Sequence, residues 1–210
     1  METPIEYDMP GVNQLALGAE TGLTWESAIQ CQLQQDPDVL LVSEVVSPQV
    51  ASIIVRVALS GHVMLMAFHA TTSRGVLRRL IAAGIERGMI AESLVGVIAQ
   101  RLLRRLCPDC RVPDPDPAAT WGPSPLPDGP WYKPVGCDSC HQMGYRGRTA
   151  IYETLEPTST LLEKLKSAED TDDSLLQDDP NEASGLLADA LKKASLGVTS
   201  LEEIRRELCH

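Results

Sequence analysis

Residues 36–44 read Asp-Pro-Asp-Val-Leu-Leu-Val-Ser-Glu, a short apolar run that ends in a carboxylate. Four consecutive apolar residues after a proline-containing turn are typical of a strand buried on both faces of a sheet. In α/β proteins that hydrolyse nucleotides, such a strand delivers an acid to the sheet edge where magnesium, phosphate and the attacking water meet. Glu44 is therefore a candidate catalytic residue, while a strand that merely ends in a surface glutamate is the alternative.

The sequence around this run alternates between strand and helix patterns. After the strand at 39–42, we expect a helix over 50–59, a second buried strand over 63–68, and helices over 76–83 and 91–106. Strands that alternate with helices indicate an α/β sheet. The expected core of this body consists of Val39, Leu41, Ile53, Val57, Leu65, Leu94 and Ile98.

Four of the six cysteines form two Cys-x-x-Cys pairs, Cys107 with Cys110 and Cys137 with Cys140, separated by 26 residues. In an intracellular protein, two such pairs indicate a tetrahedral thiolate zinc site more often than disulfides. Eight of the fifteen prolines lie between residues 112 and 134, a composition that excludes a helix or a central strand there. With few apolar residues of its own, this module is expected to depend on the metal for its stability.

Composition and charge exclude some functions. The chain has 210 residues, with 29 acidic and 18 basic side chains and a net charge of −11, which disfavours a nucleic-acid-binding protein. No apolar run approaches the roughly 18 residues of a membrane span, and the first residues do not form a signal peptide. We therefore expect a cytoplasmic protein. The acidic stretch at 169–179 is expected to be a solvated face or loop.

Arg101, Arg104, Arg105 and Arg111 form the main basic cluster. One interpretation is the solvated face of the expected helix at 91–106, because cations are favoured near the C-terminus of a helix. A contact surface for another protein is the alternative.

Four stretches carry a resemblance to a known family: 35–44 (QDPDVLLVSE), 60–69 (SGHVMLMAFH), 100–110 (QRLLRRLCPDC) and 144–153 (GYRGRTAIYE). In order and spacing they resemble the type II secretion and type IV pilus assembly ATPases, which power protein secretion or pilus assembly by ATP hydrolysis. Residues 2–7 also resemble the acidic "Asp box" of that family, and residues 197–203 resemble its C-terminal ending.

The resemblance implies roles for five residues. Glu44 matches the Walker B glutamate, Glu2 and Glu6 match acids of the Asp box, and His62 and His69 match the nucleotide-binding histidines of the His box. These roles suit the residue types, because a carboxylate can hold magnesium or orient water and an imidazole can stabilise charge near a phosphate. Two hydrogen-bonded imidazoles that only flank a strand are the alternative for the histidines.

The chain also departs from the family pattern. The P-loop sequence Gly-x-x-x-x-Gly-Lys-[Ser/Thr], whose backbone amides and lysine hold the phosphates, is absent. The family has this loop upstream of the Asp box, and no lysine of this chain precedes Lys133. Ser43 and Val46 stand where the family usually has glycine and arginine, so a phosphate-pairing guanidinium is lost. We expect this chain alone neither to bind ATP tightly nor to hydrolyse it.

The expected fold is α/β: a partial RecA-like P-loop NTPase domain with an inserted tetracysteine zinc module and a helical C-terminal tail. Residues 1–106 would form the body with the Asp box, Walker B and His box, residues 107–140 the metal module, and residues 141–210 a returning strand and an acidic helical tail. Structural Zn²⁺ is expected at Cys107, Cys110, Cys137 and Cys140, and the family implies ATP with Mg²⁺.

Three functional hypotheses follow. The first is a truncated or degenerate secretion or pilus ATPase. It would assemble with copies of itself in a hexameric ring, or with a separately encoded P-loop half, and would bind inner-membrane platform proteins. The second is a non-hydrolysing scaffold paralogue. The third is a zinc-ribbon binding module unrelated to secretion. The first two imply a cytoplasmic protein at the inner membrane and no nucleic acid. The third would need nucleic-acid binding, which the net charge of −11 disfavours.

Overall fold

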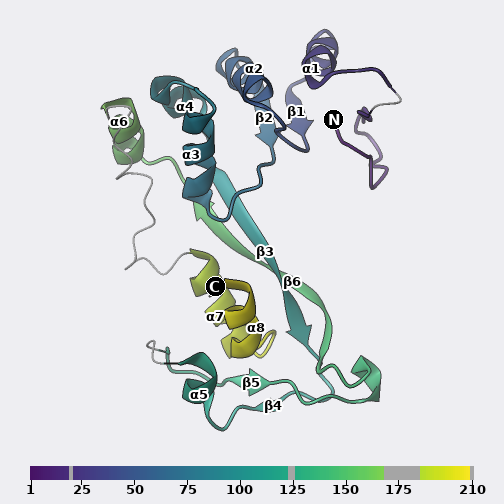
Figure 1. Ribbon diagram of the computed structural model, residues 1–210, viewed down its shortest axis with the longest axis vertical. Helices are drawn as coiled ribbons and strands as arrows, with labels where there is room; N and C mark the ends of the chain where they lie inside the picture. Colours follow the sequence, from purple (N-terminus) through teal and green to yellow (C-terminus); the bar gives the residue numbers. More distant parts are fainter. Residues whose placement is uncertain (19–20, 123–125, 168–184, 209–210) are drawn as a thin grey trace. The chain divides into compact units, whose positions relative to one another are not determined.

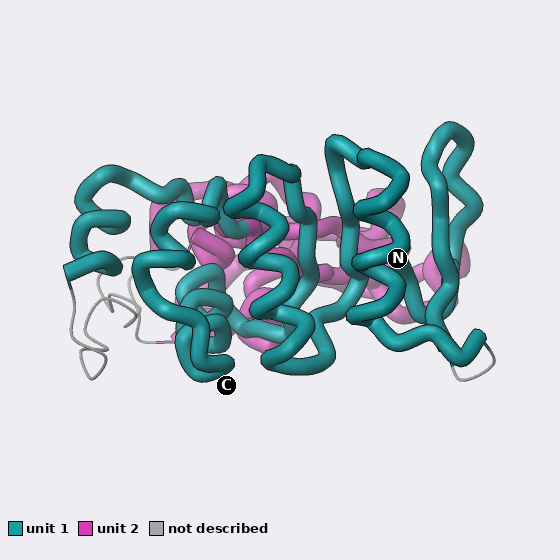
Figure 2. The backbone as a smooth tube through the Cα atoms, turned by 90° about the horizontal axis from the view of Figure 1, so that it is seen from above, with its two compact units in different colours: residues 1–97, 155–177 teal, residues 98–154, 178–210 magenta. Residues whose placement is uncertain are grey.

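The computed structural model describes residues 1–18, 21–122, 126–167 and 185–208, so the acidic stretch at 169–179 lies outside the described residues. The chain divides into two compact units (Figure 2). Unit 1 consists of Met1–Val97 and Leu155–Gln177, and unit 2 consists of Ile98–Thr154 and Asp178–His210. The division at 1–106, 107–140 and 141–210 stays a prediction. Among the described residues, no helix combines the length and the apolar composition that crossing a bilayer requires.

Unit 1 alternates helices and strands in the expected order (Figure 1). Its elements are α1 (Trp25–Leu33), β1 (Val39–Val42), α2 (Pro48–Leu59), β2 (Val63–Met66), α3 (Ser73–Ala82), α4 (Arg87–Ser93) and α6 (Ser159–Ser167). Side-chain caps begin three of the helices, since Thr24, Ser47 and Thr72 each accept a hydrogen bond from a backbone N–H in the first turn. β1 and β2 pair in parallel, with Val42 opposite Met66. The two predicted strands are confirmed.

The N-terminal residues extend this parallel pairing on the other side of β1. The Met1 amino group donates to the Leu41 carbonyl at 2.8 Å, and the Met1 carbonyl accepts from the Ser43 N–H at 3.0 Å. Glu2 in turn pairs with Ala16 in a parallel bridge. The carboxyl ends of all these segments therefore lie along one edge, where α/β proteins bind their ligands.

β1 is buried on one face only. Leu40 and Val42 pack with Ile29 of α1 and Ile54 of α2. On the opposite face, 53% of Val39 and 43% of Leu41 remain exposed, and Val63 and Leu65 of β2 are exposed beside them. The expectation that both strands are buried on two faces, with Val39, Leu41 and Leu65 in the core, is therefore wrong. Helices cover one face of this sheet, so burial alternates along each strand with a period of two.

Unit 2 is built on a long two-stranded ribbon. Its elements are β3 (Val97–Leu106), β4 (Val112–Pro113), α5 (Pro117–Trp121), β5 (Tyr132–Lys133), the 3₁₀ turn η1 (Asp138–Cys140), β6 (Tyr145–Leu155), α7 (Gly185–Ser195) and α8 (Leu201–Leu208). β3 and β6 are hydrogen-bonded neighbours that run in opposite directions (Figure 1). Leu103 of β3 and Ile151 of β6 pack with Ala190 of α7 and Ile204 of α8 in one core.

The expected helix over 91–106 is a second correction. α4 ends at Ser93, and β3 begins at Val97. Val97, Ala99 and Leu103 are buried on one side of the strand, whereas 69% of Ile98, an expected core residue, is exposed. Apolar residues at four-residue steps fit a helix and a strand alike, and pairing with β6 decides between them.

The proline-rich module is also better anchored than the sequence suggests. Within residues 112–134, which were expected to exclude helix, α5 forms five residues of helix with a proline in its first turn, where proline is tolerated. Trp121 and Trp131 are buried in the core of unit 2, together with Leu103 and Ile151. These two large side chains attach the module to the ribbon without any metal.

Candidate functional site

The parallel sheet of unit 1 brings Glu44 and His69 together at its carboxyl edge. Glu44 follows β1 by two residues and His69 follows β2 by three. Backbone hydrogen bonds from Ala67 to Val42 and from Val45 to Ala67 continue the pairing beyond the strands. His69 Nε2 lies 3.2 Å from Glu44 Oε1, with 82% of the histidine and 46% of the glutamate side chain exposed. The pair faces solvent and is accessible to a ligand.

Glu2 belongs to the same edge, because Met1 pairs beside Val42 and Glu2 is the next residue along. Gln14 orients its carboxylate, donating from Nε2 to Glu2 Oε2 at 2.8 Å. Glu6 is exposed in the loop that follows. Sequence reasoning missed Gln14, which has no motif of its own and which also accepts from the Met9 N–H and donates to the Tyr7 carbonyl.

His62 lies at the other end of β2. It directly precedes the strand, whereas His69 follows it, and its Nδ1 is 3.1 Å from the Ser60 hydroxyl. The structure therefore unites Glu2, Glu44 and His69 at one edge and leaves His62 away from them.

The chemistry of this edge is that of hard oxygen ligands. Carboxylates such as Glu2 and Glu44 suit Mg²⁺, which is usually held by one or two carboxylates, waters and substrate phosphates. A carboxylate hydrogen-bonded to an imidazole can also orient water and accept a proton. The phosphate cradle is the missing component, because the 210 residues contain no P-loop sequence.

The four predicted metal ligands converge in unit 2. The Sγ atoms of Cys107, Cys110, Cys137 and Cys140 all lie within 4.8 Å of one another. The Cys107–Cys137 and Cys110–Cys140 separations are 3.8 Å, and Cys137–Cys140 is 3.7 Å. Four thiolates around a zinc ion at 2.3 Å form a tetrahedron with edges of about 3.8 Å. The cluster fits a tetrahedral zinc ion.

Backbone N–H groups point at the sulfur atoms of this cluster. Gly136 N–H donates to Cys110 Sγ at 3.3 Å, and Gly144 N–H donates to Cys140 Sγ at 3.2 Å. Gly144 has φ of +74°, and a Cβ there would lie 2.4 Å from the Pro134 Cβ, so only glycine fits. Burial raises the pKa of the Cys140 thiol, but N–H donors outweigh burial and lower this pKa to about 7, toward the thiolate that a metal requires. For Cys110 burial prevails and raises the pKa to about 11.

A buried carboxylate supports the ribbon beside this cluster. Glu203 of α8 is fully buried and accepts hydrogen bonds from Arg104 Nε at 2.8 Å and from Arg206 Nη2 at 2.8 Å. Burial raises the pKa of Glu203, but the two guanidinium groups outweigh burial and hold this pKa at about 2. Arg104 also lies 4.2 Å from the centre of the Tyr145 ring. Arg104 thus ties β3 to α8, and the expected helical solvated face is wrong for it.

Comparisons with known proteins agree with these features. A family model described as "Type II/IV secretion system protein" matches residues 1–206. The type II secretion system protein E of Aeromonas hydrophila is 37% identical over 211 residues, which cover 98% of this chain and 42% of that protein. The type IV pilus assembly ATPase PilB of Thermus thermophilus is 34% identical over 209 residues, 97% of this chain and 24% of that protein. The chain spans less than half the length of these relatives.

Solved structures support the fold. The ATPase DotB of Legionella pneumophila superposes with a TM-score of 0.58 at 16% identity, over 87% of this chain and 42% of that one. The resemblance read from the four motifs is confirmed: the chain belongs to the type II/IV secretion system protein family.

Proposed function

We propose that this chain is the part of a secretion or pilus ATPase motor that holds the catalytic glutamate, in a partial RecA-like domain, and that it works with a P-loop from outside these 210 residues. The observation that carries the proposal is the Glu44–His69 pair, at 3.2 Å on the carboxyl edge of a parallel sheet. In this role Glu44 orients the attacking water, Glu2 and Glu6 help to hold Mg²⁺, and His69 contacts the nucleotide. His62, at the far end of β2, has only its match to the His box as support for a nucleotide-binding role.

The exposed face of the β1–β2 sheet supports the proposal that another protein segment packs against unit 1. Val39 and Leu41 of β1 and Val63 and Leu65 of β2 form an apolar face on the described part of unit 1. A contiguous apolar face of this kind marks a surface that another protein segment covers. We propose that the P-loop part of the motor packs there, in the same polypeptide, in a separate one or in a neighbouring subunit.

The cysteine cluster is proposed to hold one structural Zn²⁺ through Cys107, Cys110, Cys137 and Cys140. Its Sγ separations and the N–H donors to sulfur support this assignment. A bound zinc ion would cross-link the two Cys-x-x-Cys turns and fix the end of β3 against the start of β6.

The relatives' names suggest the setting of this activity. We propose that the motor forms a homo-oligomeric, hexameric ring at the cytoplasmic side of inner-membrane platform proteins and uses ATP with Mg²⁺. The family match does not favour an unrelated zinc-ribbon module. The relatives that cover this chain do not favour a non-hydrolysing scaffold either.

The test restores the P-loop part and measures hydrolysis. The chain is assayed alone and joined to the preceding part of the Aeromonas relative, of which it matches 42%. We expect no ATP hydrolysis by the chain alone, and hydrolysis by the joined protein that Glu44→Gln abolishes. Glu86→Gln is the matched control, because Glu86 is an exposed acid of unit 1 whose side chain makes no capping hydrogen bond. Joined protein without activity would favour the scaffold, and activity insensitive to Glu44→Gln would refute the assigned role.

A further inference from the structure

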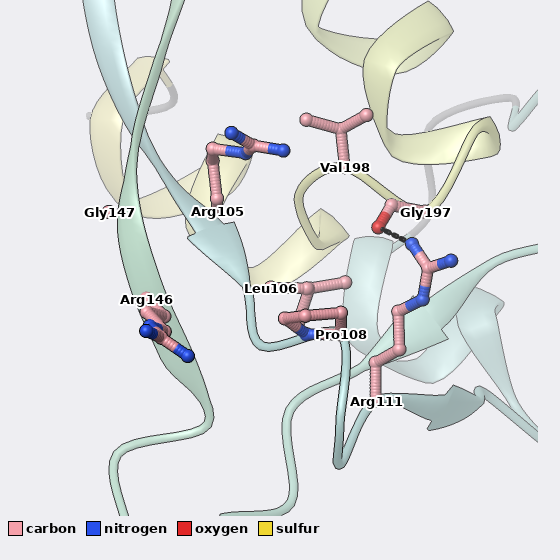
Figure 3. Close-up of a pocket in the computed structure, with 8 residues that line it drawn as sticks. All are labelled: Arg105, Leu106, Pro108, Arg111, Arg146, Gly147, Gly197 and Val198. Atoms are coloured by element: carbon pink, nitrogen blue, oxygen red, sulfur yellow. Dashed lines mark hydrogen bonds between the residues drawn. The ribbon is translucent and has the colours of Figure 1, made fainter. Parts of the chain in front are cut away.

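Unit 2 contains a pocket of about 530 Å³ that neither the nucleotide site nor the cysteine cluster uses (Figure 3). Its charged lining comes from three different segments: Arg105 near the end of β3, Arg111 after the first Cys-x-x-Cys pair, and Arg146 near the start of β6. Leu106, Pro108 and Val198 supply an apolar wall. The pocket is within the size range of small-molecule sites.

Within the described part of the chain, no acidic side chain neutralises the positive charge of Arg105 and Arg146 in this pocket. Among the described residues, no carboxylate pairs with Arg105 or Arg146, whereas neighbouring Arg104 is paired with buried Glu203. Three guanidinium groups thus gather around one hollow in a chain whose net charge is −11. Like charges repel, so an anionic ligand would stabilise the arrangement.

Arg111 is held in place before any ligand arrives. Its guanidinium donates to the Gly197 carbonyl and lies 5.1 Å from the centre of the Tyr132 ring. Gly197 has φ of +68°, a backbone conformation that favours glycine, and a Cβ there would lie 2.6 Å from Arg111 Nη1. Arg111 therefore supplies a fixed positive charge in the wall of the pocket.

We propose that this pocket binds the phosphate group of an organic phosphate, with Arg105 and Arg146 contacting the oxygens and the apolar wall contacting the organic part. A phosphate monoester carries nearly two negative charges and three acceptor oxygens, so it can satisfy more than one guanidinium fork at once. A carboxylate has one charge and two oxygens, and it matches a single fork. The site is independent of the proposed hydrolytic role of Glu44.

The test uses phenyl phosphate as the probe and the purified, metal-containing 210-residue chain. We expect saturable binding of one phenyl phosphate per chain by calorimetry at physiological ionic strength. Benzoate, which carries the same ring with a carboxylate, should bind at least about tenfold more weakly. Arg105→Gln and Arg146→Gln should each weaken phenyl phosphate binding about tenfold, the lower range for one charge-assisted contact.

Arg56→Gln is the matched control, since it removes one positive charge from α2 of unit 1 and should leave binding unchanged. Arg105 and Arg146 are both exposed, so their variants should keep the thermal midpoint of the parent protein. Vesicles of phosphatidic acid, whose headgroup is a phosphate monoester, and of phosphatidylcholine identify the source of the phosphate. If the protein binds the anionic vesicles and phenyl phosphate displaces it, the source is a lipid headgroup. If the protein does not bind these vesicles, the source is a free ester. No phenyl phosphate binding, equal benzoate binding, or equal loss in Arg56→Gln would overturn the proposal.

Discussion

The two units differ in how many of their polar and apolar side chains find partners within the unit. In unit 2, buried Glu203 is matched by two arginines, two tryptophans anchor the proline-rich module, and four cysteines converge to within 4.8 Å. In unit 1, the Glu44–His69 pair is open to solvent and one face of the β1–β2 sheet remains apolar and exposed. Unit 2 thus pairs these particular groups within itself, whereas unit 1 leaves the Glu44–His69 pair and an apolar face exposed.

The largest expected effect is in unit 2 and comes from metal removal. Purified protein should contain one zinc per chain by elemental analysis, and Cys137→Ser should abolish it, whereas Cys31→Ser, at an exposed cysteine outside the cluster, should not. Structural zinc contributes apparent binding energies of about 10 to 16 kcal/mol in small peptides. Metal-free protein should lose amide protection in the two Cys-x-x-Cys turns.

The tryptophans limit how far this loss spreads. Trp121 and Trp131 attach α5 and the start of β5 to the core, so these elements should keep their protection when the metal is removed. This outcome is narrower than the unfolding of the whole 107–140 module that the sequence predicts. Unchanged protection in the cysteine turns of metal-free protein would contradict the zinc assignment.

The next effect tests the buried carboxylate. Glu203→Gln removes the charge that Arg104 and Arg206 share, and breaking a buried ion pair typically lowers the free energy of unfolding by about 3 to 5 kcal/mol. Glu202→Gln, at the exposed neighbouring residue, should change it by less than about 0.5 kcal/mol. Denaturant titration of both variants measures the difference, and equal effects would show that Glu203 is not a structural centre.

The same residue predicts a pH dependence. The folded-state pKa of Glu203 is about 2, below its ordinary value of 4.5, so the stabilisation is complete above the ordinary value and is lost as pH falls toward 2. The thermal midpoint of the parent protein should fall over this window. In Glu203→Gln the fall should be smaller, and an identical pH profile would count against the assigned pKa.

A smaller effect contrasts the two faces of β1. Val42→Ala truncates a fully buried side chain and should lower the free energy of unfolding by about 1 to 3 kcal/mol. Leu41→Ser, on the exposed face, should lower this free energy by less and should reduce self-association in sedimentation experiments. Equal self-association of Leu41→Ser and the parent would show that this apolar face does not mediate self-association.

Features that depend on local sequence could be predicted from the sequence, whereas features that depend on pairing between distant segments could not. The cysteine cluster follows from two tight turns of fixed spacing, so it was visible in the sequence. The run Val39–Val42 revealed a strand but not which face is buried, because four apolar residues hide the alternation. β3 was mistaken for helix because its partner β6 is distant in sequence. The importance of Glu203 was hidden for the same reason, since Arg104 is 99 residues away.

The central claim is that unit 1 holds only part of a nucleotide site. Isothermal titration of the 210-residue chain with Mg-ATP tests it most directly, because P-loop amides and lysine supply most phosphate contacts in this class of protein. The account predicts no saturable binding to the nucleotide edge in the Arg105→Gln background, in which binding to the proposed phosphate pocket is weakened about tenfold. A dissociation constant in the low micromolar range that Glu44→Gln alters would contradict it.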